Sequence, residues 1–445
     1  MTAFNNTSDS MKEIRSSSKN LDVYKYVLAI KNMCDKKLFP DNFDVWTVEE
    51  QYTWINENLA TFFPTVPQTL LRYIPSFYQQ PNFDRSPTEI PEWLDMEKYS
   101  RGQKLVRDYY LSVIFAKILG IIYVYSFVDD LKPIIQNRQA DTPYLGFERY
   151  LSTILRILDW YNGQPWVKGT AACKNMEYAH RMHSLMRKKL CELDDEQIDN
   201  ASKVAKPWCP DRELLLKDFA LACPFEKSGQ RPHIMLENLP MHKPKGLHST
   251  SIAMTQCSFI STILLTPQKL GIHNATDEDL EAFCHMWRYY GYSLGLDDEQ
   301  NFCHGSFEEV KERVQDYYRY WVIPNLKEIT PEWEHMTRCL VEPLNYYPFI
   351  YMPYKVMMLL ATDALNLDMP NLYASLSYAE WIAHKGWKFI IEYAMKFSMV
   401  RAALNKVILK IIDTAVNFST EKRAQLKKRS EEQLLNFCVR YQNQT

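Results

Sequence analysis

Hydrophobic residues recur every three or four positions along most of the chain after residue 91, with charged residues between them. This spacing places apolar side chains on one face of an α-helix, so it predicts helices rather than strands. The segments with the clearest periodicity are residues 97–127, 144–161, 175–193, 249–264, 277–294, 306–322 and 332–339. Because these segments suffice to form a bundle, we predict an all-α protein with one large helical domain.

The regions outside these segments suggest how the chain is organised. Residues 1–20 are polar and predict a disordered N-terminus, and residues 21–90 predict a helical, proline-rich arm that wraps the main domain. The main domain is expected at residues 91–355. Residues 195–247 form a poorly periodic, proline-containing insertion within it, which is either a lid or a passive surface segment. Residues 356–445 predict amphipathic C-terminal helices.

The last long apolar segment begins near residue 386 and carries several lysines. On one continuous helix, Lys388, Lys396, Lys406 and Lys410 would fall within roughly 80° of one another, with Arg401 outside that sector. Such a helix either lies on a membrane surface or packs on the core with its lysines in solvent. Both interpretations are kept as expectations.

Composition and charge narrow the function classes. Hydrophobic residues make up 46% of the 445-residue chain and there are only 12 glycines, which favours long helices. The net charge of −2 and the absence of a basic block argue against nucleic acid as a partner. The ten cysteines include no CxxC pair, so buried, reduced thiols are expected.

Targeting features are sparse in this sequence. The polar N-terminus lacks the apolar region of a secretory signal, so we expect a cytoplasmic protein. The longest apolar run, residues 109–127, contains Lys117 and Gly120 and ends at Asp129 and Asp130. A central lysine is costly inside a bilayer, so we expect a buried core helix rather than a membrane span.

Two pairs of residues could carry chemistry. His180 and His183 lie three residues apart and therefore share a helix face, where each is either a hydrogen-bonded core residue or a ligand. Arg149 and Thr153 lie four residues apart on another helix and could together bind an oxygen species or an anion. Alternatively, Arg149 reaches solvent and Thr153 bonds back to its own helix.

Four stretches resemble a known family: RYLSTILRILDWY, RMHSLMRK, TSIAMTQCSFISTILLTPQKLGI and MWRYYGYSLGLDDEQNFCHGSFEEV. The family contains the bacterial latex-clearing rubber oxygenases and the fungal ER-bound MpaB-type oxygenases, and the chain looks closest to its arthropod members. The resemblance covers residues 91 to about 355. Its most specific stretch is the last, which contains Trp287 and Arg288.

The resemblance implies an oxidoreductase that holds haem b in a globin-like core and uses dioxygen as co-substrate. It implies that His183 is the proximal iron ligand, since the family's thirty-residue spacing from a threonine to the axial histidine recurs from Thr153 to His183. Arg149 and Thr153 would line the opposite side of the haem as catalytic residues, and Trp287 and Arg288 would help to bind it.

The implied reaction is oxygenation or oxidative cleavage of an unsaturated isoprenoid or lipid-like hydrophobic substrate. The implied location is the cytoplasm or the cytosolic face of the endoplasmic reticulum. One departure concerns Ser152, which stands where the rubber oxygenase has an iron-capping lysine, so a five-coordinate or water-bound iron is expected. His180 is assigned to support, and His248 is a weaker additional pocket candidate.

Three other interpretations remain open. Glu-x-x-His spacing at Glu177/His180 and Glu332/His335 is typical of di-iron carboxylate sites, although the second copy is expected at an exposed helix start. The acidic groups at residues 129–130 and 297–299 could bind magnesium and a diphosphate, although ordinary solvation of helix ends explains them equally. A catalytically silent helical protein that binds a lipid or isoprenoid is the non-enzymatic alternative.

Overall fold

The computed structural model of the chain describes residues 21–222, 229–239 and 243–442, and side chains as far as residue 439. Throughout these residues the regular secondary structure is helical, and the described part contains no strand. The prediction of an all-α protein is therefore confirmed. The predicted disorder of residues 1–20 lies outside the described residues.

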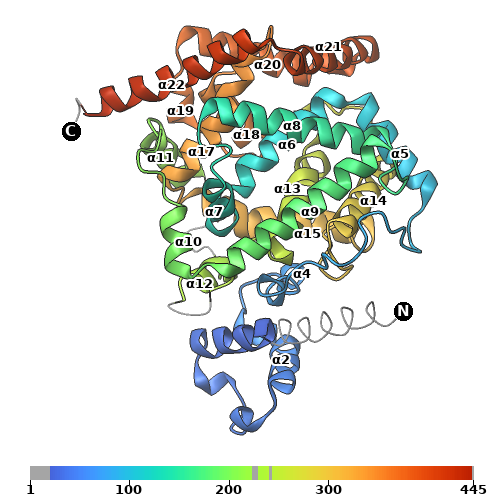
Figure 1. Ribbon diagram of the computed structural model, residues 1–445, viewed down its shortest axis with the longest axis vertical. Helices are drawn as coiled ribbons and strands as arrows, with labels where there is room; N and C mark the ends of the chain where they lie inside the picture. The colour runs from blue at the N-terminus through green and yellow to red at the C-terminus, as the bar shows by residue number, and fades with distance from the viewer. Residues whose placement is uncertain (1–20, 223–228, 240–242, 443–445) are drawn as a thin grey trace, which may run out of the picture.

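Two closely packed helix pairs organise the main domain, one at its side and one in its middle (Figure 1). Helix α5 (Met96–Asp108) packs on α14 (Asp277–Ser293), and α6 (Tyr110–Val124) packs on α13 (Ser249–Leu265). A Cβ atom at Gly120 would lie 2.4 Å from the Ser258 carbonyl oxygen, which is closer than side-chain carbons approach. Glycine therefore allows α6 and α13 to come into backbone contact.

The periodic segments of the sequence match helices within a few residues, because most begin at a side chain that caps the helix N-terminus. The segment 97–127 divides at Tyr109 into α5 and α6, and the segment 306–322 divides into α15 (Phe307–Tyr317) and the π-helix η5 (Tyr318–Val322). The others correspond to α8 (Pro143–Asn162), α9 (Ala171–Glu192), α13, α14 and α17 (Pro331–Val341).

Helix α6 lies inside the core, as expected for a buried helix rather than a span. By length and composition, no single helix of the described residues could cross a membrane, and α6 with α7 (Val128–Gln136) passes that test only as a pair bent by 104°. The amine of Lys117 is buried, and its Nζ donates a hydrogen bond of 2.6 Å to the Phe259 carbonyl oxygen. Burial explains why α6 is apolar on nearly every side.

The N-terminal region is largely helical and contacts the main domain. Residues 21–33 are helical, and α2 (Val48–Glu57) lies at one end of the molecule (Figure 1). The backbone N–H of Asn82 donates to the Gly295 carbonyl oxygen, and the Phe83 ring meets His180 of α9 edge to face. The short helices of this region are η1 (Lys36–Leu38), η2 (Phe43–Val45), α3 (Leu59–Phe62), α4 (Gln68–Leu71) and η3 (Pro75–Phe77).

The insertion at residues 195–247 contains regular structure that its sequence did not indicate. It forms α10 (Asp195–Ala201), α11 (Arg212–Ala222) and α12 (Pro232–Glu237). Helices of two or three turns offer too few positions for a clear hydrophobic period, which is why the sequence looked irregular. The remaining short helices of the main domain are η4 (Pro267–Leu270), α16 (Ile323–Leu326) and η6 (Glu342–Tyr346).

The C-terminal region lies mostly at the opposite end from α2, although its first helix is buried in the main core (Figure 1). It comprises α18 (Tyr354–Ala364), α19 (Pro370–Ala374), α20 (Tyr378–Glu392), η7 (Ala394–Lys396), α21 (Ser398–Val416) and α22 (Thr420–Gln442). The prediction of one continuous helix from residue 386 to residue 416 is wrong, because the chain turns at η7. The alignment of four lysines on that helix therefore does not hold.

One large apolar core joins these layers, since its contacting buried residues run from Tyr26 to Ile391. A smaller cluster around Phe147 and Ile412 fixes α8 to α21 and α22. Helix α8 is thus held from both sides, which fixes the positions of Arg149 and Thr153.

Candidate functional site

Helices α8 and α9 form an antiparallel hairpin that carries the predicted site residues. Near the connection, the Asn175 side chain donates a hydrogen bond of 2.7 Å to the Asp159 carboxylate, and the Arg156 guanidinium lies 4.4 Å from the centroid of the Tyr178 ring. These contacts hold the hairpin at its closed end. Arg149 and Thr153 on α8, and His183 on α9, lie further from the connection.

The His183 ring lies deep in the protein as a neutral imidazole. Burial, with a smaller contribution from the charges of His180 and Arg149, lowers the pKa of His183 to about 4. Its Nδ1 is buried and has no hydrogen-bond partner, yet the residue keeps some accessible surface. A neutral imidazole with an unpaired ring nitrogen is able to bind a metal.

His180 lies one turn away and is buried against Phe83, with the ring centroids 5.5 Å apart. Its Nε2 also lacks a hydrogen-bond partner, and burial lowers its pKa. A protonated His180 would disfavour protonation of His183. The His180 ring itself packs against the N-terminal region through Phe83.

Arg149 and Thr153 share a face of α8, as their spacing predicted. The Thr153 hydroxyl donates a hydrogen bond of 2.9 Å back to the Arg149 carbonyl oxygen. This is the alternative in which the threonine bonds to its own helix. The guanidinium of Arg149 keeps its Nη1 buried without a partner. A buried, unpaired guanidinium nitrogen is costly, so this position suits an anion or an oxygen-bearing ligand.

An enclosed apolar space lies beside Thr153 and measures about 40 Å³. Its walls include Lys117, Tyr150, Thr153 and Tyr161. Residues of α6, α8, α13 and α17 line this space, and none comes from α9. Pockets for cofactors usually measure several hundred Å³ (about 300 to 1,000), so a macrocycle would require these helices to move apart. His183 and Arg149 offer donor atoms that suit a haem, but neither lines this space, and its volume does not fit the macrocycle.

The two candidates on α14 lie in different surroundings. Trp287 packs behind the wall of the space beside Thr153, where its ring lies 4.1 Å from Lys117 Nζ. Arg288 instead pairs with Asp298 at 2.9 Å and stacks on the Trp93 ring, and no contact joins it to α8 or α9. The structure therefore brings Arg149, Thr153 and His183 together, with Trp287 nearby, and leaves Arg288 engaged elsewhere.

His248, the weaker candidate, is fully buried and caps the N-terminus of α13. Its Nδ1 accepts the backbone N–H of Ser251 at 3.0 Å, and its Nε2 lies 2.9 Å from the Asp129 carboxylate. Since Nδ1 accepts a bond, the proton resides on Nε2, and neither nitrogen is free.

The neighbouring Asp130 carboxyl has its pKa raised to about 7 by burial and by the charge of Asp129. The interpretation of Asp129 and Asp130 as solvated residues at a helix end therefore does not describe their environment.

The di-iron interpretation does not agree with the structure. Glu177 is exposed whereas His180 is buried, so they do not face a common site. His335 uses both ring nitrogens, accepting from the Trp208 N–H and bonding to the Asp141 carbonyl oxygen. The expectation that its helix starts in solvent is wrong, because Trp333–Val341 are buried. Across residues 21–222, 229–239 and 243–442, no three His, Cys, Asp or Glu residues form a group able to hold a metal ion.

The magnesium interpretation gains no support from the second acidic group either. Asp297 pairs with Arg85, and Asp298 pairs with Arg288. These carboxylates are already neutralised by arginines on neighbouring segments. They lie in a structural ion network rather than at an open metal position.

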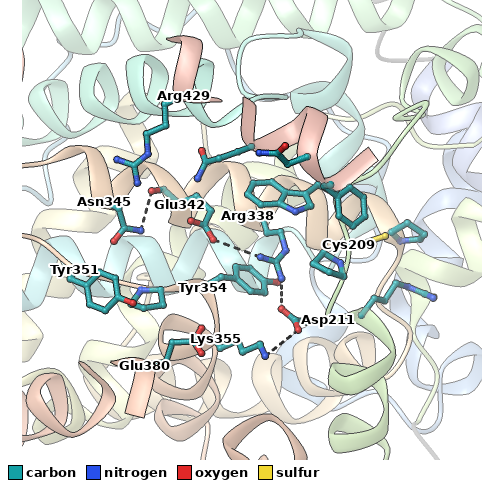
Figure 2. Close-up of a pocket in the computed structure, with 18 of the residues that line it drawn as sticks. Cys209, Asp211, Arg338, Glu342, Asn345, Tyr351, Tyr354, Lys355, Glu380 and Arg429 are labelled. Carbon is teal, nitrogen blue, oxygen red and sulfur yellow. Dashed lines mark hydrogen bonds and ion pairs between the residues drawn. The ribbon is translucent and has the colours of Figure 1, made fainter. Parts of the chain in front are cut away.

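A large polar cleft of about 970 Å³ was not anticipated from the sequence (Figure 2). At its centre the Arg338 guanidinium pairs with Asp211 and with Glu334, and its carbon lies 3.9 Å from the centroid of the Tyr354 ring. Lys355 lies 3.6 Å from Asp211. Figure 2 shows Arg338 linked to Asp211 and to Glu342, and Asp211 linked in turn to Lys355.

This cleft lies where the C-terminal helices meet the core, since it includes Arg429 of α22 and Glu380 of α20. Its lining comes from segments more than two hundred residues apart, so no local motif could have revealed it. Because its central charges are paired within the protein, the cleft explains how the C-terminal layer is attached rather than which ligand is bound.

Comparisons with known proteins add no relative to this picture. No protein-family model, no curated protein and no solved structure matches the chain. The resemblance to the rubber oxygenases stays a prediction that depends on the residues themselves.

Proposed function

We propose that this chain is a haem b-dependent oxygenase that uses dioxygen on an unsaturated isoprenoid or lipid-like substrate. The observation that carries the proposal is the His183 imidazole, which is neutral, has no hydrogen bond at Nδ1 and lies near the Arg149 guanidinium, whose Nη1 is also unpaired. An unsatisfied buried polar atom costs free energy unless a ligand completes it, and here two such groups from α8 and α9 lie near each other. The family resemblance on RMHSLMRK identifies the same residue.

The residues around His183 have definite roles in this proposal. A bound haem would supply the dioxygen chemistry. His183 would hold it through a ring nitrogen, while Arg149 would direct its unpaired Nη1 toward a negatively polarised oxygen atom. The apolar walls beside Thr153 would bind a hydrocarbon chain by burial and would exclude water. Ser152 has a hydroxyl and no amine, so α8 would offer no lysine nitrogen to the group.

The experiment is a titration of purified full-length protein with haem, followed by absorption spectroscopy. We expect a Soret band at one haem per chain, and we expect His183→Ala to abolish or sharply weaken it. His304→Ala is the matched control, because that imidazole lies beside Arg288 and Asp298, outside the hairpin. Protein that stays free of haem after supplementation would refute the proposal.

A second function is favoured by the apolar walls of the internal spaces. The space beside Thr153 and a neighbouring apolar space of about 70 Å³ are lined almost wholly by apolar side chains. Such walls suit a hydrocarbon chain, although both spaces would have to widen to hold one. A lipid- or isoprenoid-binding protein without oxygenase activity fits this feature, and it predicts saturable binding of a fluorescent fatty acid together with no Soret band.

A further inference from the structure

The solvent side of α20, η7 and α21 is apolar, which is unusual for the surface of a soluble fold. Phe389 is 63% exposed, Phe397 is 67% exposed and Met399 is 85% exposed. The exposed residues of α20 recur at helical spacing, so they share one face, while His384 and Ile391 point inward. We call this surface the C-terminal face, defined by Trp381, Ile382, Phe389, Tyr393, Phe397 and Met399.

The charges on this face have one sign. Lys385, Lys396, Lys406 and Lys410 are exposed and form no ion pair with any residue that the structure describes. Within residues 377–416, all of which are described, Asp413 is the one exposed carboxylate. Glu380 caps the N-terminus of α20, and Glu392 pairs with Lys388. The face therefore combines large apolar side chains with unneutralised positive charge.

A neighbouring loop extends the same surface. Phe349 is fully exposed and has a φ of 63°, a left-handed conformation that is strained for a bulky residue. The Trp387 indole of α20 donates a hydrogen bond of 3.0 Å to the Tyr351 carbonyl oxygen, which attaches this loop to α20. The fold thus holds an aromatic ring in solvent beside the C-terminal face at the expense of backbone strain.

We infer that the C-terminal face docks on the surface of an anionic phospholipid bilayer. Aromatic, methionine and aliphatic side chains enter the boundary between headgroups and acyl chains, while lysines reach the headgroup phosphates. A second copy of the chain fits less well, because a symmetric dimer would bring the unpaired lysines of both copies together. The inference does not depend on haem binding.

The inner side of the same helices supports a lipid surface rather than a protein partner. Trp387, Ile391 and Met395 line an apolar space of about 70 Å³ between the C-terminal helices and α6. Helix α20 is consequently apolar on its inner and outer sides. A hydrocarbon chain that leaves the bilayer at this face would have an apolar space directly behind the docked helix.

The test is flotation of the full-length protein with vesicles of phosphatidylcholine, with or without phosphatidylserine. We expect binding to the vesicles that contain phosphatidylserine, and weaker binding at high salt. Phe389→Ser with Phe397→Ser, and separately Lys396→Glu with Lys406→Glu, should each weaken binding about tenfold or more. Val45→Ser with Leu221→Ser is the matched control, since those side chains are equally exposed on other elements and should leave binding unchanged.

Three outcomes would overturn the inference. The first is that the wild type floats with neither vesicle type, and the second is that the control and both face variants bind equally well. The third is that the wild type is a dimer in size-exclusion chromatography with light scattering, and that only the phenylalanine variant is a monomer. All four substituted positions of the face are exposed, so circular dichroism should show an unchanged fold. None of these measurements involves haem. A negative result would therefore not bear on the oxygenase proposal, which is tested separately by the haem titration.

Discussion

The Lys117 amine and the Trp287 indole meet inside the core, with Nζ 4.1 Å from the ring centroid. Two further rings, those of Phe259 and Phe283, lie within 5.3 Å, and the amine donates to the Phe259 carbonyl oxygen. No carboxylate pairs with Lys117 among the described residues, and burial lowers its pKa well below the usual value. Aromatic faces thus replace a counter-ion at the centre of α6.

Replacing this amine should stabilise the protein. Lys117→Met keeps the length of the side chain and removes the cost of burying an amine, so we expect the free energy of unfolding at pH 7 to rise by about 1 to 3 kcal/mol. Urea unfolding followed by tryptophan fluorescence measures this. A loss of more than about 1 kcal/mol would instead show that the contacts with the rings and the carbonyl oxygen outweigh desolvation.

The buried histidines should make stability depend on pH. The folded-state pKa of His183 is about 4, below its usual 6.5, so its stabilising contribution is present above pH 6.5 and is lost as pH falls toward 4. Between pH 7 and pH 5 we expect the free energy of unfolding to fall by about 2 kcal/mol more in the wild type than in His183→Gln. His233, whose pKa burial lowers to about 3, should give a similar result in His233→Gln. An unchanged pH dependence in both variants would contradict the burial of these rings.

The contact between α6 and α13 should not tolerate a side chain at residue 120. In Gly120→Ala the new Cβ would lie 2.4 Å from the Ser258 carbonyl oxygen, so the helices must separate, and we expect a loss of about 1 to 3 kcal/mol. Gly386→Ala is the matched control, because nothing lies within 4 Å of that position in α20. The control should stabilise the chain by about 0.5 to 1 kcal/mol. Thermal unfolding compares the two, and equal effects would argue against this packing.

The ion network in the polar cleft should be essential for stability. Arg338→Met would leave the fully buried Glu334 without its partner, and we expect a loss of about 3 to 5 kcal/mol. Lys98→Ala removes an exposed pair with Glu281 and should cost less than about 1 kcal/mol. Similar losses in the two variants, measured by chemical unfolding, would show that the network around Arg338 is open to solvent.

Sequence patterns predicted the helices well where capping and periodicity coincide. The segment expected at residues 249–264 is Ser249–Leu265 in the structure, and its N-cap is the neighbouring His248. The turn at η7 was missed because neither proline nor glycine marks it. The burial of Trp333–Val341 was also missed, because glutamates at a helix start usually face solvent and here one of them pairs with an arginine of its own helix.

The candidate site was only partly accessible to sequence reasoning. Helical spacing alone placed Arg149 with Thr153 and His180 with His183, because these pairs share a helix face. The approach of α8 to α9 came from the resemblance and not from any periodicity. The engagement of Arg288 with Asp298 depends on residues brought together by the tertiary fold, which local spacing does not encode.

The two apolar spaces flank a common partition of three isoleucines: Ile114, Ile118 and Ile154 line both. Each of these side chains has its own rotamers, so a single torsional change alters the volume on both sides of the partition at once. Shortening one of them to alanine would therefore merge the compartment under α20 with the one beside Thr153, so these three side chains set the size of the largest continuous space in this part of the interior.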